Sequence, residues 1–296
     1  MWFFQTQSLA LLSLVVASFG GARAEVPPPT EEQLRNQNNT LSFGLYSSTL
    51  TNVSQVVFPG YEPLDVWGPL EILFSISYSY KISLSVISHE AGLISSRPPP
   101  HRMSPGAPLM DLGWMIGPTI EATHTFRNAP ALDVIMVPGG TGLDYLYSVN
   151  DTAIQDFINI RYHQANYFLS VCTGSSALAT AGILDGRRAT TNKWAWKGVT
   201  SMRPEVNWVP TARWVEDGNI WTSSGVAAGM DMMYAFLKHL YGEQQLNTVM
   251  NNIELVPHTD PDWDPFSVVH NVPGADTSRD MKDCFGPVEP GEPIVV

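Results

Sequence analysis

The 296-residue chain has only two cysteines and is short of basic residues, with 16 Lys and Arg against 28 Asp and Glu. Two cysteines cannot build a disulfide framework. A net charge of −12 without a basic stretch argues against nucleic acid as a partner. The chain also lacks His-x-x-x-His, Cys-x-x-Cys, Gly-x-Gly-x-x-Gly and Walker patterns, so no metal or other cofactor is expected.

Long apolar runs are absent except near the start of the chain. Residues 9–19 form an apolar run that is too short to span a bilayer. The run is followed by Ala22-Arg23-Ala24, a small-residue cleavage pattern. We therefore expect residues 1–24 to be a signal peptide, with a short membrane anchor as the alternative. We expect the protein to be secreted and to have no stable membrane span.

Both ends of the remaining chain have the composition of irregular structure. Residues 25–41 are rich in Pro and Asn and predict a disordered leader, and residues 257–296 predict an extended tail over the surface or a partner subunit. Asn-x-Ser/Thr triplets begin at Asn38, Asn52 and Asn150 and predict glycosylation in a secreted chain, although such triplets also arise by chance.

Between these ends, short apolar segments alternate with helical ones. Strands are expected at 42–46 or 54–58, and at 81–87, 115–126, 133–137, 167–171, 189–191, 209–215 and 220–223. Helices are expected from Leu64, with Pro69 in the first turn, and at 153–164, 175–181 and 227–241. This alternation is typical of a parallel sheet covered by helices on both faces. It predicts one α/β domain over residues 42–256.

Cys172 stands where the strand at 167–171 gives way to the helix at 175–181. A sharp turn from strand to helix exposes the turn residue, and the helix N-terminus favours a thiolate. We therefore predict an acidic, nucleophilic cysteine, with the hydroxyl and amide of Thr173 beside it. In the alternative interpretation, Cys172 is a small buried hydrophobe and Thr173 is a helix cap.

Other candidate site residues also follow expected strands, so they should meet at the carboxyl edge of the sheet. Asp65 can hold or relay a proton for the thiol, or can serve only the helix dipole. Glu71, one or two turns further along, is the second-choice acid. Gly139, Gly140 and Thr141 can bind an oxyanion or substrate through backbone N–H groups.

Three sequence blocks carry a resemblance to a known family. They are Phe58-Pro-Gly-Tyr-Glu-Pro-Leu-Asp-Val-Trp-Gly-Pro69, Ala131-Leu-Asp-Val-Ile-Met-Val-Pro-Gly-Gly-Thr-Gly142 and Ser170-Val-Cys-Thr-Gly174. They resemble the ThiJ/PfpI branch of the class I glutamine-amidotransferase-like superfamily, and within it the isonitrile hydratase-like subgroup. The resemblance implies a flavodoxin-like three-layer sandwich, usually a homodimer. It implies Cys172 as nucleophile, Asp65 as the carboxylate that contacts it and Thr173 as an assisting neighbour.

The implied reaction is the addition of water to a small-molecule isonitrile, which gives an N-formamide. The alternatives are a glyoxalase- or deglycase-type cysteine enzyme and a non-catalytic oxidant sensor or binding protein. Thr173 stands where protease relatives carry a histidine, which argues against a peptidase. Asn192 and Lys193 stand where the family usually has one histidine, and residues 47–53 are an insert. Tryptophans are expected either to line an apolar pocket or to pack in the core, at positions 194, 196, 208, 214 and 221.

Overall fold

The structure, a computed structural model, describes residues 27–38, 52–102, 106–279 and 281. The predicted signal peptide, the candidate strand at 42–46, most of the insert and Cys284 lie outside the described residues.

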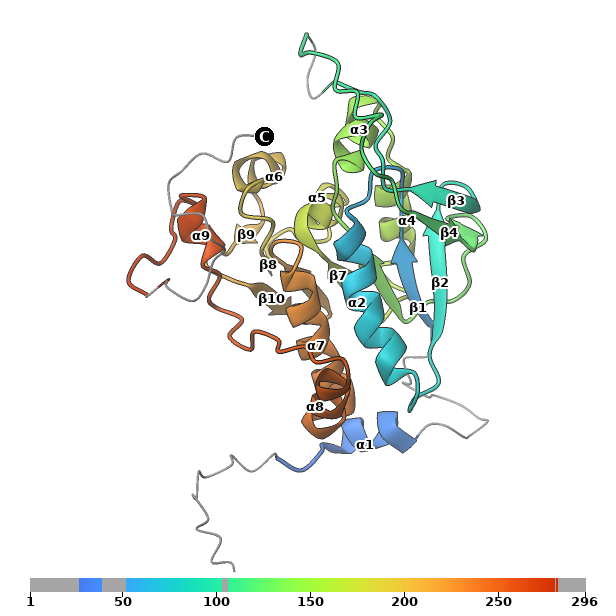
Figure 1. The fold of residues 1–296 in the computed structure, drawn as a ribbon, viewed down its shortest axis with the longest axis vertical. Helices are drawn as coiled ribbons and strands as arrows, with labels where there is room; N and C mark the ends of the chain where they lie inside the picture. The colour runs from blue at the N-terminus through green and yellow to red at the C-terminus, as the bar shows by residue number, and fades with distance from the viewer. Residues whose placement is uncertain (1–26, 39–51, 103–105, 280, 282–296) are drawn as a thin grey trace, which may run out of the picture.

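A seven-stranded sheet forms the centre of the protein, in the order β10-β11-β7-β6-β1-β2-β5 (Figure 1). Its strands are β1 (Asn52–Val56), β2 (Ser83–Ser88), β5 (His124–Thr125), β6 (Val134–Val137), β7 (Tyr167–Ser170), β10 (Trp214–Asp217) and β11 (Ile220–Ser223). Every pair is parallel except β10 with β11. The predicted mostly parallel sheet is confirmed.

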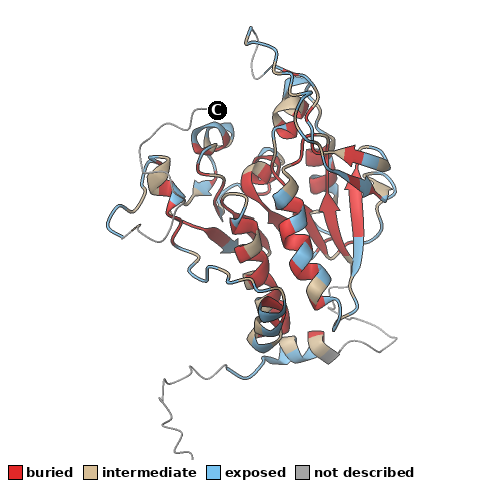
Figure 2. Cartoon of the chain, in the orientation of Figure 1, coloured by how far each residue is buried: buried red, intermediate tan, exposed pale blue. Residues whose placement is uncertain are grey.

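Helices cover both faces of this sheet. On one face, α2 (Pro63–Ile76), α7 (Ala228–Tyr241) and α8 (Glu243–Asn252) pack against one another, while α4 (Ala153–Arg161) and α5 (Ser175–Thr180) pack together behind the sheet in Figure 1. The buried residues follow the sheet and the helix surfaces that face it (Figure 2). The fold is therefore the predicted flavodoxin-like α/β sandwich.

The remaining elements are short and lie around the sandwich. They are β3 (Gly92–Ser95) paired with β4 (Thr119–Ala122), β8 (Arg188–Ala189) paired with β9 (Asn207–Trp208), and the helices α3 (Gly142–Ser148), α6 (Trp196–Met202) and α9 (Phe266–Val269). In the part of the chain that the structure describes, no helix has the length and apolar character needed to cross a membrane.

The start of α2 differs from the prediction. The helix begins at Pro63, and Pro69 lies inside it rather than in its first turn. Pro63 has the fixed φ and the missing N–H that suit the first helical position. The ring of Pro69 instead removes the bond that its N–H would have made four residues back, to the carbonyl of Asp65. The strand before the helix is also shifted, because β1 ends at Val56 rather than at residue 58.

The prediction of a disordered leader is wrong for α1 (Glu31–Asn38). Thr30 and Gln33 form a capping box: the Gln33 amide donates to Thr30 Oγ1 (3.2 Å) and the Thr30 amide donates to Gln33 Oε1 (2.9 Å). The helix packs on the end of α7. Its buried Asn36 donates from Nδ2 to the carbonyl of Leu240 (2.8 Å), one of the last-turn carbonyls that an α-helix leaves unpaired.

Asn36→Ala should lower the free energy of unfolding by about 1 kcal/mol, because the Leu240 carbonyl loses its donor in a buried position. Urea denaturation measures this change. Glu32→Ala, on the exposed side of the same helix, is the matched control and should leave the midpoint unchanged. Equal midpoints for the two variants would show that α1 does not contribute to stability.

The C-terminal segment covers the surface beside β10, as predicted, but it also reaches the core. The carbonyl of Pro261 accepts from the Arg213 amide (2.7 Å), and the Asp264 amide donates to the carbonyl of Thr211 (2.7 Å). Asp264 is completely buried. Residues 257–272 thus belong to the folded unit, and contact with a partner subunit stays a prediction.

The predicted glycosylation sites differ in their surroundings. Asn150 is exposed in the turn after α3 and has a φ of 55°. Asn52 lies in β1 and its Oδ1 accepts from Ser83 Oγ (2.5 Å), while the Ser54 of its triplet is buried. Asn38 is the last residue of α1. Asn150 is thus more accessible than Asn52, and glycosylation stays a prediction for all three.

Candidate active site

Cys172 sits in a sharp turn between β7 and α5, as the sequence predicts. It begins a short 3-10 turn, η1 (Cys172–Gly174), and has a φ of 58°. A left-handed backbone at a residue other than glycine costs about 1–3 kcal/mol and requires support from its surroundings. That support comes from the hydroxyls of Ser175 (3.3 Å) and Thr191 (3.2 Å), which both donate to the Cys172 carbonyl.

Asp65 meets Cys172 from α2, at the same edge of the sheet. Its side chain is completely buried, and its Oδ2 accepts a hydrogen bond from the Gly139 amide (2.7 Å). The carboxyl faces the Cys172 thiol closely enough for each group to shift the pKa of the other. The predicted convergence of the acid and the thiol is therefore present in the structure.

The pKa of the thiol contradicts the prediction of an acidic cysteine. Burial, followed by the charge of Asp65, raises the pKa of Cys172 well above its ordinary value. Burial likewise raises the pKa of Asp65 well above its ordinary value. The short helix α5 does not offset the loss of water around the sulfur. Both shifts favour the protonated forms of the thiol and the carboxyl, which are the forms that can donate a proton.

Two hydrogen-bond donors face the sulfur. The Thr173 amide donates to it, as predicted for this residue, and the side chain of Asn192 donates from Nδ2 to Cys172 Sγ (3.1 Å). Both interactions favour negative charge on sulfur and so lower the pKa of Cys172. Asn192 is absent from the predicted site residues, although its place in the family's usual histidine position was a signal.

The two glycines at the end of β6 bind side chains of the site through their amides. The Gly139 amide is bound to Asp65, and the Gly140 amide donates to Thr173 Oγ1 (3.0 Å). Both N–H groups are thus bound within the site itself, although Gly140 also lines the cavity in front of the cysteine, and an oxyanion or substrate-binding role for them stays a prediction. Their hydrogen bonds orient the acid and the threonine. Thr141 lies beside them and lines the cavity in front of the cysteine.

The second-choice acid, Glu71, does not lie at the cysteine site. Glu71 lines an apolar groove with Trp67 and Phe74 on the outer side of α2, and it does not line the cysteine cavity. Glu62, directly before α2, lines that cavity. Its charge raises the pKa of both Asp65 and Cys172. Glu62 is therefore the second carboxyl of the site.

A cavity of about 370 Å³ opens in front of Cys172. Its apolar wall includes Leu143, Val199, Met202 and Val226, and its polar groups include Tyr147 and Asp144. Of the five tryptophans that were considered, Trp194 alone lines it. Trp214 and Trp221 are core residues, and the rings of Trp196 and Trp208 pack edge to face. The cavity has the size of a small-molecule site.

Lys193, next to Asn192, is buried with its ammonium group. Burial lowers the pKa of Lys193 to about 7. No group of three His, Cys, Asp or Glu suited to a metal ion occurs within residues 27–38, 52–102, 106–279 and 281.

The low pKa of Lys193 makes folding depend on pH. Between pH 7 and 10 the unfolded chain keeps the lysine proton while the folded protein has largely lost it, so this residue's contribution to stability rises with pH. The free energy of unfolding of the wild type, relative to Lys193→Met, should therefore increase from pH 7 to pH 10. Urea denaturation at several pH values measures the difference. A constant difference would show that the Lys193 pKa is ordinary.

Comparison with known proteins agrees with this site. The DJ-1/PfpI family profile matches residues 53–239. The chain is 33% identical over 220 residues to the isonitrile hydratase of Pseudomonas putida, covering 72% of this chain and 85% of that protein. A ThiJ/PfpI family protein from Pseudomonas syringae superposes with a TM-score of 0.56 at 26% identity, over 70% of this chain and 76% of that one. Drosophila melanogaster DJ-1beta has the same fold, with a TM-score of 0.54 at 17% identity over 70% and 98%. The chain belongs to the DJ-1/PfpI family.

Proposed function

We propose that the protein is an isonitrile hydratase-like enzyme that adds water to the terminal carbon of an isonitrile and releases an N-formamide. The proposal rests on one observation above all, the buried pair of Cys172 and Asp65, of which Cys172 lines a small-molecule cavity. The 33% identity to a protein named isonitrile hydratase supports it.

In the first step the thiol of Cys172 adds to the isonitrile carbon. A carbon–sulfur bond forms, and Asp65 passes its proton to that carbon while it accepts the thiol proton. The product is a thioimidate, R–N=CH–S–Cys172, and Asp65 is protonated again. An uncharged isonitrile suits a thiol and a carboxyl whose surroundings favour their protonated forms, because the addition requires one nucleophile and one acid.

In the second step water adds to the thioimidate carbon. Asp65 takes a proton from the water and gives one to the nitrogen, which leaves R–NH–CH(OH)–S–Cys172. The carbon–sulfur bond then breaks, the hydroxyl loses its proton through Asp65 and the sulfur regains one. The N-formamide R–NH–CHO leaves. These reaction steps need no oxidant, reductant or cofactor.

The raised pKa of the thiol favours this proposal over an oxidant sensor. Peroxides oxidise the thiolate, and sensor cysteines are exposed groups of low pKa. Cys172 is buried and its pKa is raised. Secretion, a homodimer and glycosylation stay proposals that rest on the sequence, and the exposed Asn150 is an accessible position for a glycan.

The experiment is incubation of the purified full chain with an aryl isonitrile in water enriched in oxygen-18. We expect the N-formamide to carry the heavy oxygen, and mass spectrometry of the quenched protein to show Cys172 increased by the mass of one intact isonitrile. Formamide formation no faster than in buffer, over a panel of aryl and alkyl isonitriles, would refute the proposal. Lactate from methylglyoxal would then support the glyoxalase alternative.

A further inference from the structure

The loop of residues 190–195 contacts Cys172 through two side chains. Thr191 binds the Cys172 carbonyl, and Asn192 binds its sulfur. The amide of Asn192 has a fixed orientation, because its Oδ1 accepts from the Ala195 amide (3.1 Å). Its NH₂ group therefore has to face the sulfur.

The side chain of Lys193 anchors this loop through buried contacts. Its Nζ donates to Thr190 Oγ1 (2.7 Å) and to the carbonyl of Ala212 (2.9 Å), and it lies 4.8 Å from the centre of the Trp196 ring. These contacts lie on both sides of Asn192 in the sequence. They fix the backbone next to the side chain that reaches the sulfur.

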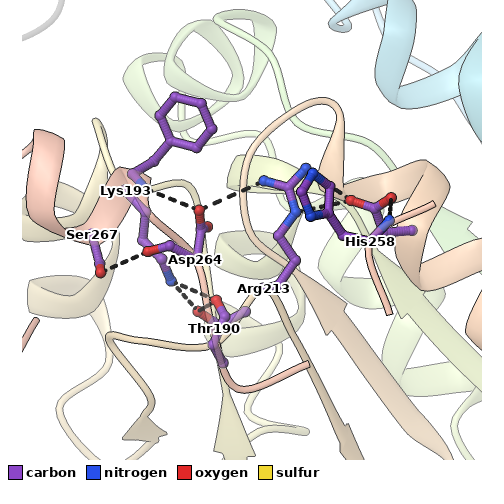
Figure 3. A network of polar contacts seen from close by, with 9 residues as sticks. Thr190, Lys193, Arg213, His258, Asp264 and Ser267 are labelled. Carbon is purple, nitrogen blue, oxygen red and sulfur yellow. Dashed lines mark hydrogen bonds and ion pairs between the residues drawn. The ribbon is translucent and has the colours of Figure 1, made fainter. Parts of the chain in front are cut away.

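The C-terminal segment completes the anchor. Asp264 lies between Lys193 and Arg213 in Figure 3, and its negative charge acts on the Lys193 ammonium. Arg213 Nη1 is 3.6 Å from Asp264 Oδ1, and its Nη2 is 2.8 Å from Asp231 Oδ2 of α7. The Ser267 hydroxyl donates to the Asp264 carbonyl (2.8 Å). A buried network of charges thus links the C-terminal segment to the loop that carries Asn192.

The surroundings of the sulfur explain why such a donor is needed. The charged groups that face Cys172 are the carboxyls of Asp65 and Glu62, which both oppose negative charge on sulfur. Bulk water is excluded, since Cys172 is buried. The favourable partners are the Thr173 amide and the Asn192 side chain.

We propose that Asn192 is a catalytic residue that stabilises the Cys172 sulfur while the sulfur loses its proton, and that Lys193 is the positioning residue that presents Asn192 to it. The inference deepens the proposed function, because it depends on Cys172 acting as the nucleophile. Asp264 of the C-terminal segment holds Lys193 in this role.

The test is the pH dependence of Cys172 alkylation by iodoacetamide, measured in the full chain with Cys284→Ser so that one thiol reports. Asn192→Leu has a similar volume but no donor. It should reduce the alkylation rate at pH 8 at least ten-fold and move the midpoint of the pH profile upward. Lys193→Met should also reduce the alkylation rate at pH 8, by at least three-fold, and move the midpoint of the pH profile upward. The matched control is Lys197→Met on exposed α6, which should react like the parent protein.

An Asn192→Leu profile that matches the parent would overturn the role of Asn192, and a Lys193→Met profile that matches Lys197→Met would overturn the role of Lys193. If Lys193→Met does not fold, Thr190→Val takes its place: it removes one of the two acceptors of Lys193 Nζ and should shift the profile in the same direction by a smaller amount. The readout needs no isonitrile. Shifted alkylation profiles without formamide production would support the role of Asn192 and refute the hydratase activity. Formamide production with unshifted profiles would support the hydratase activity and refute the role of Asn192.

Discussion

Asp65→Asn should lower kcat for formamide formation by about a thousand-fold, because the amide cannot exchange protons with the thiol, the isonitrile carbon or water. The substitution keeps the shape of the side chain, and an amide oxygen can still accept from Gly139 N–H, so the fold should persist. Cys172→Ala should reduce the rate to that of buffer, because the nucleophile itself is gone.

Initial rates of formamide formation, measured by chromatography over a range of isonitrile concentrations, separate kcat from KM. Glu71→Gln is the matched control: it removes a carboxylate from the same helix, on a side that does not face the cysteine cavity. It should retain the wild-type rate. A loss of activity in Glu71→Gln that equals the loss in Asp65→Asn would remove the acid role from Asp65.

Gly174→Ala should destabilise the fold by about 3 kcal/mol and abolish activity. A Cβ at this position would lie 2.3 Å from the Val137 carbonyl oxygen and 2.8 Å from two backbone atoms of Pro138. These atoms end the central strand β6 and cannot rotate away. The turn would therefore have to shift, and because Cys172 lies in this turn, its thiol would move away from Asp65.

Urea denaturation and the formamide assay together measure this effect. Gly198→Ala is the control for stability, since a Cβ there meets no atom within 4 Å and Gly198 lies inside α6. Alanine in a helix interior should raise the free energy of unfolding by up to about 1 kcal/mol. Equal urea midpoints for the two glycine variants would show that close packing of the turn on β6 does not fix the position of Cys172.

The fold and the meeting of Cys172 with Asp65 follow from sequence because both depend on local patterns. Alternating apolar strands and helices indicate a parallel sheet, and side chains that follow its strands gather at one edge. The left-handed Cys172 turn agrees with a cysteine placed between a strand and small residues. The capping box at Thr30 is a local pattern too, but the prediction for the leader rested on its Pro- and Asn-rich composition and missed it.

The errors concern quantities that depend on distant parts of the chain. Whether a thiol is acidic depends on how much water and charge surround it, and no local pattern shows that Asp65 and Glu62 both face Cys172. The Gly139 and Gly140 amides look free in the sequence because their acceptors lie 74 and 33 residues away. The replacement of the usual histidine drew attention to Asn192, but only its contact with the sulfur shows which group it serves.

The capping of α7 by α1 limits how far this protein can be shortened. The family profile ends at residue 239, inside α7, and begins at residue 53, after α1. An expression fragment trimmed to that span would lose the last two residues of α7 together with the side chains of Gln33, Asn36 and Gln37 that cap it. The span that the family profile matches is therefore smaller than the unit that folds, and recombinant work should retain residues 30–272.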